Sequence, residues 1–182
     1  ALGATNFAYC GVWGQAASNY SFHAYPTDYV VIDHCNIYNT NKPLYLRNAL
    51  NSTITNNIVM KITSGYYGIY ARNCVNLIFD DNVCTSNYNR GFNIEDTTSI
   101  SSFDGGTFHS NGSYGLFLQV YRNATVKNID TWRNNGYGLS ISDTHTSRFE
   151  NINAVGNNNY TIYFGLSSSV VFDTVTATVN II

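Results

Sequence analysis

The segment Gly138-Leu139-Ser140-Ile141-Ser142 is followed eleven residues later by Phe149-Glu150-Asn151, and this pair of motifs recurs along the whole chain. The first motif alternates apolar and polar residues, which places residues 139 and 141 on one face of a strand and residues 140 and 142 on the other. The second motif is an apolar anchor, a polar residue and a turn former. Its anchors are 22–25 residues apart and are Phe7, Ile32, Ile54, Phe79, Phe103, Val126, Phe149 and Phe172.

Clusters rich in Asn and Gly, such as Asn134-Asn135-Gly136, separate the short segments and are typical of tight corners. One repeat of this length cannot bury its own apolar face, but repeats stacked on one another bury a continuous core. The sequence therefore predicts an all-β fold, a single-stranded right-handed parallel β-helix (a β-solenoid) with about 7–8 coils of 22–25 residues. We expect one domain over residues 1–182 with both ends uncapped, because no amphipathic helix precedes Phe7 or follows Phe172.

The composition of the 182 residues excludes several classes of protein. A hydrophobic fraction of 44% with 15% aromatic residues argues against disorder, and the longest apolar runs are too short for a membrane span. A net charge of −2 with 11% charged residues gives no basic face for nucleic acid. Few Lys and Glu beside many Asn and Tyr favour an extracellular or cell-surface location.

The two motifs together resemble the right-handed parallel β-helix of the pectate-lyase-like superfamily, and the resemblance extends over essentially the whole chain. It implies the fold more than the function, because lyases, hydrolases, epimerases, phage tailspikes and adhesins all use it. Of the motifs of polygalacturonases, only Asp80-Asp81 has a counterpart here. The even spacing also leaves no long insertion to build the walls of a deep cleft.

The constant phase of the repeats predicts which residues stack inside the column. Asn57 and Asn82 fall in one inward column and predict a short internal asparagine ladder. Cys10 and Cys35 fall one coil apart in the same column, within reach of a disulfide. Cys84 lies in an apolar column, which predicts a free thiol in the core, and Cys74 remains unassigned.

Outward columns carry aromatic rings beside arginines, a combination that suits the apolar faces and hydroxyl edges of sugars. An alternative is that stacked rings only stabilise neighbouring strands. The carbohydrate-binding candidates are Tyr45, Arg47, Tyr70, Arg72, Phe117, Tyr163 and Trp132.

Two groups of residues are weak candidates for catalysis. Asp80, Asp81 and Asp104 lie on adjacent coils, as paired carboxylates of a glycosidase or oxygen ligands of Ca²⁺ would. The alternative is a row of ordinary solvated acids. Glu95 with Arg72 is the second group, for which a surface ion pair is the alternative. We expect no other metal and no other cofactor.

Five sequons offer glycosylation candidates, at Asn19, Asn51, Asn111, Asn123 and Asn159. Two functions remain open. The first is an extracellular structural solenoid, a filament, surface or spike subunit whose residues 180–182 stack on the first coil of the next copy near Phe7 and Trp13. The second is a polysaccharide-binding or polysaccharide-cleaving domain. The expected partners are other copies of the chain, end to end, and glycans.

Overall fold

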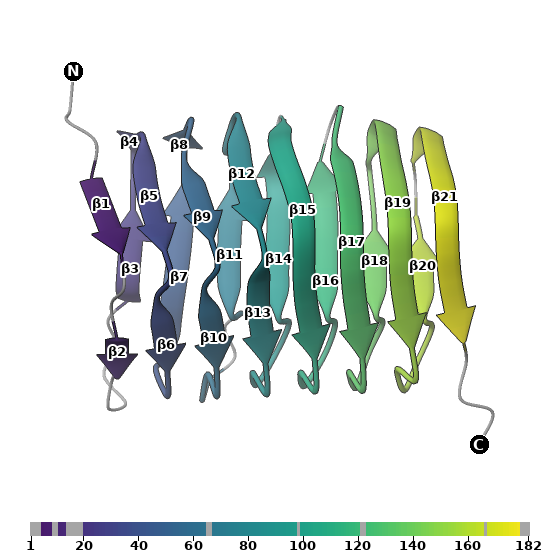
Figure 1. The fold of residues 1–182 in the computed structure, drawn as a ribbon, viewed down its shortest axis with the longest axis horizontal. Coiled ribbons are helices and arrows are strands. Elements are labelled where there is room, and N and C mark those ends of the chain that lie inside the picture. Colours follow the sequence, from purple (N-terminus) through teal and green to yellow (C-terminus); the bar gives the residue numbers. More distant parts are fainter. Residues whose placement is uncertain are drawn as a thin grey trace.

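The computed structural model describes residues 5–8, 11–13, 20–64, 67–97, 99–120, 123–165 and 167–178. Figure 1 shows the strands side by side in one elongated column, with β1 (Thr5–Ala8) at one end and β21 (Ser168–Thr178) at the other. The described ranges contain strands, turns and bends but no helix, and so no helix that is long and apolar enough to cross a membrane.

One side of the column is a seven-stranded parallel sheet with one strand from each repeat. Its strands are β3 (Tyr20–Ala24), β7 (Lys42–Arg47), β11 (Ile69–Arg72), β14 (Phe92–Thr97), β16 (Leu116–Val120), β18 (Leu139–Ile141) and β20 (Ile162–Phe164).

The rest of the column is a twelve-stranded sheet that bends along its length. In the first turns each repeat contributes two short strands, namely β1 and β2 (Gly11–Trp13), β5 (Val30–Asp33) and β6 (Asn36–Tyr38), β9 (Thr53–Thr55) and β10 (Ile58–Met60), and β12 (Leu77–Asp80) and β13 (Asn82–Thr85). In later turns the two merge into β15 (Ile100–His109), β17 (Thr125–Trp132), β19 (His145–Val155) and β21. A small third sheet pairs β4 (Thr27–Asp28) with β8 (Ala49–Leu50).

Every strand pair is parallel, and the register is the one that the repeat phase predicts. Ile69 pairs with Phe92, and Leu139 pairs with Ile162. The predicted class, a parallel β-solenoid, is therefore confirmed. Seven strands in one sheet span six full turns, slightly fewer than the seven to eight coils expected, because the repeats at the two ends are partial.

The core is a continuous stack of apolar side chains that runs along the axis of the column. Phe79, Phe92, Phe103 and Phe108 are at most 1% exposed, and their rings contact one another with centroids 4.8–6.1 Å apart. This burial is what one repeat alone could not achieve.

Residues with positive φ form the corners between strands. Asn, Asp and Ser supply most of them, since their short polar side chains tolerate the left-handed region. Gly105 has φ of 77°, and a Cβ there would lie 2.0 Å from Asp81 Oδ1, so this corner requires glycine.

Candidate functional site

We call the outward side of the seven-stranded sheet the tyrosine–arginine face. Three rows of side chains, each with one residue per turn, define it. The first is His23, Tyr45, Tyr70, Asn93, Phe117, Ser140 and Tyr163; the second is Tyr25, Arg47, Arg72, Glu95 and Gln119; the third is Tyr67, Arg90, Tyr114, Tyr137 and Tyr160. The register of the first row is the predicted one, so the sequence located this face correctly.

Aromatic rings on this face contact their neighbours in adjacent turns. The Tyr45 and Tyr70 centroids are 5.0 Å apart. Tyr114, Tyr137 and Tyr163 form what we call the outer tyrosine stack, with successive centroids 4.6 and 5.0 Å apart and interplanar angles of 8° and 14°. Stacked rings cover one another's faces, so much of this stack offers its edges and hydroxyls to a ligand.

Two members of the first row are buried although they point away from the core. Asn93 is fully buried and Ser140 is 2% exposed, whereas the sequence predicted an exposed row. The Arg90 side chain hydrogen-bonds Asn93 Oδ1, and the flanking aromatic residues are much larger than Asn or Ser. The face is therefore a packed outer layer of side chains on the sheet.

Arg90 is the centre of this layer. Its guanidinium carbon lies 5.3, 4.8 and 4.2 Å from the ring centroids of Tyr67, Tyr114 and Phe117. Its Nη1 lies 3.5 Å from Glu95 Oε1. Both side chains are less than a quarter exposed, so the rings and the carboxylate together replace the water that Arg90 loses.

Glu95 accepts from Tyr70 and Asn93 as well. The Tyr70 hydroxyl donates to Glu95 Oε2 at 2.7 Å, and Asn93 Nδ2 donates to Oε1 at 3.0 Å. Burial, and then the Glu95 hydrogen bond, raises the pKa of Tyr70 well above its usual range, so the phenol stays protonated at neutral pH. Arg72, the expected ion-pair partner of Glu95, instead pairs with Asp96 at 3.1 Å, because Glu95 is already engaged.

Arg47 differs from the other two arginines of the face. Its guanidinium carbon lies 5.3 Å from the centroid of the Tyr25 ring, and both residues are exposed. Its neighbour in register is another cation, Arg72. Within the described ranges, no carboxylate forms an ion pair with Arg47. Its positive charge is therefore available to an external anion.

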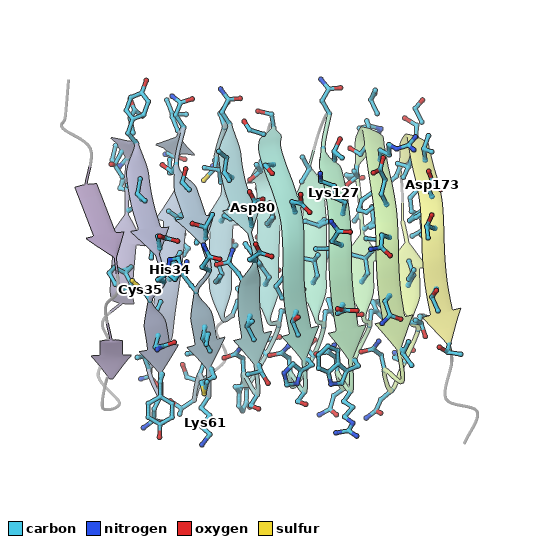
Figure 2. All side chains as sticks on the ribbon, viewed as in Figure 1. His34, Cys35, Lys61, Asp80, Lys127 and Asp173 are labelled. Carbon is cyan, nitrogen blue, oxygen red and sulfur yellow. The ribbon has the colours of Figure 1, made fainter. Side chains whose placement is uncertain are left out.

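The acidic candidates form a row on the other side of the column, where Figure 2 labels Asp80, Lys127 and Asp173. Asp80 Oδ1 accepts from Ser102 Oγ and from the backbone N–H of Asp104, both at 2.8 Å. Lys127 Nζ lies 2.9 Å from Asp104 Oδ2. The hydrogen bond from Lys127, and then the one from Asn128, lowers the pKa of Asp104, whereas a general acid needs a raised pKa.

Asp81, the third acidic candidate, lies at a corner with φ of 53° and is exposed. The structure thus places Asp80, Asp81 and Asp104 close together, as predicted. The carboxylates of Asp80 and Asp104 have the contacts of a structural row, in which a hydroxyl, a backbone N–H group and a lysine satisfy them.

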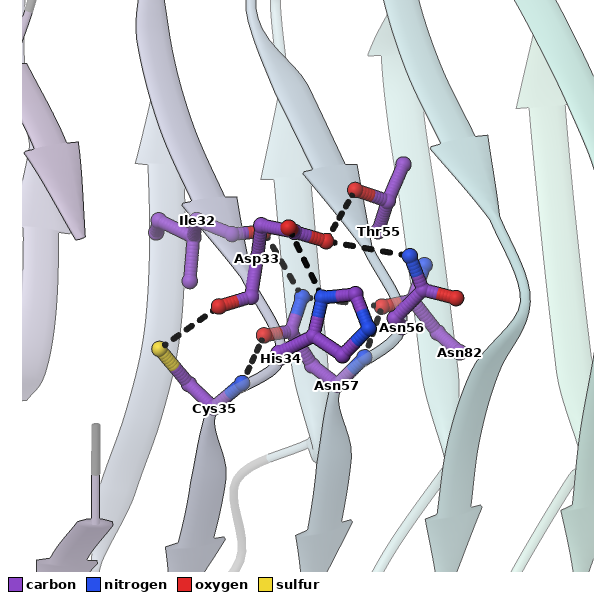
Figure 3. A network of polar contacts seen from close by, with 8 residues as sticks. All are labelled: Ile32, Asp33, His34, Cys35, Thr55, Asn56, Asn57 and Asn82. Carbon is purple, nitrogen blue, oxygen red and sulfur yellow. Dashed lines mark hydrogen bonds and ion pairs between the residues drawn. The ribbon is translucent and has the colours of Figure 1, made fainter. Parts of the chain in front are cut away.

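The same row begins with the network in Figure 3. Asp33 Oδ1 accepts from Thr55 Oγ1 at 2.8 Å and from Asn56 Nδ2 at 3.0 Å, while His34 Nδ1 lies 2.8 Å from Oδ2. The Asn56 hydrogen bond is the largest cause that lowers the pKa of Asp33 to about 2. The carboxylate therefore stabilises this corner in its charged form.

Figure 3 also shows the predicted asparagine ladder inside the column. Asn57 Nδ2 donates to Asn82 Oδ1 at 3.0 Å, and Asn57 Oδ1 accepts from the Cys35 backbone N–H at 2.9 Å. Both asparagines are fully buried. This prediction is confirmed.

A second, longer asparagine ladder was not predicted. Asn87, Asn111, Asn134 and Asn157, which we call the inner asparagine ladder, are at most 2% exposed. Each Nδ2 of the first three donates to the next Oδ1, at 3.0, 3.0 and 2.8 Å. Asn111, Asn134 and Asn157 were predicted to form corners, because each is followed by Asn or Gly, but the spacing of 24, 23 and 23 residues from Asn87 onward was the signal for a ladder.

The sequon asparagines lie in different environments. Asn111 is 1% exposed and its Nδ2 also donates to the Cys84 carbonyl, so a glycan has no access to it in the folded protein. Asn51, Asn123 and Asn159 are exposed, and Asn19 lies outside the described residues.

The cysteines divide into bonded and free. Cys35 is disulfide-bonded, and Cys10, its expected partner, lies outside the described residues. Cys84 is a buried free thiol, as predicted, and Cys74 is also free and buried. Burial raises the pKa of both thiols, which leaves them unreactive.

Trp132, the remaining aromatic candidate, is far from the tyrosine–arginine face in the sheet order. It ends β17 and stacks on His109, with centroids 4.4 Å apart and an interplanar angle of 3°. Within the described ranges, no group of three or more His, Cys, Asp or Glu side chains could hold a metal ion.

No curated protein matches the chain. Among solved structures, the A-module of mannuronan C-5 epimerase AlgE4 from Azotobacter vinelandii is similar, with 15% identity and a TM-score of 0.48. The alignment covers 85% of this chain and 63% of that one, so the chain spans less than two thirds of that module. A family model described as "Right handed beta helix region" matches residues 4–99 and 45–182, and the chain therefore belongs to the right-handed β-helix family.

Proposed function

We propose that this β-helix binds an acidic polysaccharide across its tyrosine–arginine face, outside the cell. The observation that carries the proposal is the exposed Arg47–Tyr25 pair, a cation held over an aromatic ring with no carboxylate partner within the described ranges. A uronic acid has both the carboxylate that Arg47 would pair with and the hydroxyls that the neighbouring phenols would bind. The disulfide at Cys35 supports an oxidising compartment.

The surrounding side chains favour one negatively charged ligand at this position. Arg72 lies beside Arg47 in register but is neutralised by Asp96, and Arg90 is neutralised by Glu95. Arg47 therefore carries the uncompensated positive charge of the face. His23 lies between Tyr25 and Tyr45, with centroids 6.3 and 5.1 Å from theirs, and extends the aromatic surface beside it.

Binding without bond cleavage fits the contacts of the acidic residues better than catalysis. Asp104 is held as a carboxylate by Lys127, and Glu95 is engaged by Tyr70, Asn93 and Arg90. The depressions found on the described part of the molecule are shallow and lie outside the tyrosine–arginine face, whereas an active site needs walls that exclude water.

Titration calorimetry with polygalacturonate, alginate and neutral dextran tests the proposal. We expect saturable binding of at least one polyuronide, and a loss of about tenfold or more in Arg47→Gln. Lys61→Gln is a matched control, because Lys61 Nζ lies 5.5 Å from the centroid of the Tyr38 ring, on the other sheet. Equal losses in both variants, or no binding of any polyuronide, would contradict the proposal.

A second candidate function is end-to-end assembly into a filament or spike, which the last turn favours. Phe172 is 41% exposed, although Phe149, its neighbour in the same inward column, is fully buried. Phe164 is 46% exposed. Within the described ranges β21 pairs only with β19, so its outer edge can accept a strand of another copy.

Sedimentation velocity and negative-stain microscopy test this assembly. Phe172→Lys places a charge in the inward column and should abolish end-to-end association. Val171→Lys is the matched control, because Val171 follows Arg148 in an outward column. A native protein that stays monomeric at all concentrations rules out this candidate.

A further inference from the structure

We propose that Trp132 is the platform of a second, separate binding site, which stacks against the apolar face of a neutral hexose ring. This site lies on the twelve-stranded sheet and does not depend on the tyrosine–arginine face. It is formed where β17 and β19 end side by side.

One face of the Trp132 indole is already fixed by the preceding turn. His109 pairs with Trp132 in register and stacks on it in a nearly parallel orientation, with centroids 4.4 Å apart. The His109 ring is itself held, since its Nδ1 lies 3.2 Å from Thr85 Oγ1 and 3.1 Å from Ser110 Oγ. The indole is therefore held in place before any ligand arrives, which lowers the entropic cost of binding.

The other face of the indole is left partly open by the following turn. Its neighbour in register is Val155, whose side chain is far shorter than an indole. A depression lies there, lined by Thr131, Trp132, Arg133, Asn153, Val155 and Gly156. Gly156 has no side chain to fill this depression. The column of stacked rings therefore stops at Trp132, and the depression beside the open face of the indole is what we call the shelf.

Polar groups around the shelf match the hydroxyl edge of a sugar. Arg133 is exposed at a corner with φ of 53° and offers donors. Asn153 Nδ2 donates to Asp130 Oδ1 at 2.9 Å, which orients the Asn153 amide. A flat apolar surface bordered by donors and acceptors is the pattern that a pyranose ring requires.

The charges around the shelf favour a neutral ligand. Arg133 is the one charged residue among those that line the depression, and the Asp130 carboxylate lies next to the lining because it accepts from Asn153, so the two opposite charges leave little net charge to attract an anion. A nucleobase would stack on the indole equally well, but its phosphate would gain no net attraction here. We therefore assign the site to neutral hexoses, with an affinity on the order of millimolar for one ring and tighter binding for an oligosaccharide that also reaches neighbouring surface.

Saturation-transfer difference NMR with cellotriose, mannotriose and chitotriose tests the assignment on the full chain. We expect at least one trisaccharide to receive saturation on its ring protons and to bind saturably. Tryptophan fluorescence in a Trp13→Phe background, where Trp132 is the one remaining tryptophan, should shift with the same midpoint. No saturable signal with any of the three sugars would overturn the proposal, as would stronger binding of adenosine monophosphate.

Two variants locate the site. Trp132→Ala removes the platform, and Val155→Phe fills the open face with a ring that continues the stack; each should weaken sugar binding at least tenfold. Val83→Phe is the matched control, because Val83 is likewise a partly buried outward residue, but on β13. Unchanged binding in a folded Val155→Phe protein would overturn the proposal even if Trp132→Ala is unstable. Arg47→Gln should weaken polyuronide binding but leave binding of the neutral trisaccharides unchanged, which separates the two sites.

Discussion

The inner asparagine ladder and the outer tyrosine stack are both built from one residue per turn, yet they differ in what their contacts satisfy. The asparagines are buried, and their amides bond to each other and to backbone groups. The tyrosines of the stack contact one another through ring faces and are half-buried or exposed. The period of a repeat therefore places a residue in a column, whereas burial decides whether the column stabilises the fold or forms a surface.

The largest loss of stability is expected from Asn134→Ala, which interrupts the inner asparagine ladder. Asn134 Oδ1 accepts from the backbone and side-chain N–H groups of Asn111, and its Nδ2 donates to the Phe108 carbonyl and to Asn157. Because these groups stay buried without a partner, we expect a loss of roughly 3–5 kcal/mol in the free energy of unfolding. Urea denaturation followed by circular dichroism measures it.

Asn135→Ala is the control for this variant, since Asn135 is the exposed neighbour of Asn134 and its side chain accepts, within the described ranges, only from the Asn158 side chain. Its cost should stay within about 0.5 kcal/mol. Similar losses at both positions would show that the ladder has no special role.

A smaller effect is expected from Tyr137→Ala, which interrupts the outer tyrosine stack. Tyr137 loses its contacts with Tyr114 and Tyr163, so we expect a loss of about 1–2 kcal/mol in the free energy of unfolding. Tyr137→Phe keeps the stack and should cost almost nothing. A loss as large as that of Asn134→Ala would remove the distinction between ladder and stack.

The smallest effect is expected from Asp33→Asn and depends on pH. The hydrogen bonds to Asp33, with the one from Asn56 the largest cause, lower its pKa from 3.8 to about 2, so the carboxylate adds stability above pH 3.8 that is lost as the pH falls toward 2. Because the side chain is partly solvated, we expect about 1 kcal/mol at pH 7. Thermal unfolding of wild type and variant between pH 2 and 7 should show their difference shrink as the pH falls.

Asn56→Gly provides a second background for this test. Glycine is chosen because Asn56 has φ of 54°, a backbone conformation that glycine adopts without strain. That variant lacks the main donor to Asp33, so Asp33→Asn made in its background should show a weaker pH dependence. A difference of equal size at all pH values would assign the effect of Asp33 to packing.

The fold could be predicted from the sequence because the motif spacing varies by only three residues over the chain. The Asn57–Asn82 ladder and the outward columns followed directly from this phase. The contacts within the tyrosine–arginine face could not be predicted in the same way. The phase places Arg72 opposite Glu95, but the choice between Asp96 and Glu95 as its partner depends on side-chain directions and on competition from Tyr70 and Arg90.

The inner asparagine ladder was missed for a related reason. Asn beside Gly indicates a corner, and Asn111, Asn134 and Asn157 do lie at corners, but with their side chains turned inward. Local propensity describes the backbone at such a position and not the direction of the amide. The inward direction of the amide can be inferred only from the repeated spacing of the asparagines.

The parallel register also has a consequence for how the chain folds. Successive partners lie 25 residues apart at Thr5 and Val30 and 22 apart at Ile32 and Ile54, and the other turns are similar. The entropy lost in closing each loop is therefore nearly the same for every turn. No turn needs a distant segment of the chain to form, so folding can nucleate at any adjacent pair of turns and propagate to the next turn on either side. A column lengthened by duplication of turns would therefore gain stability without a slower loop-closing step.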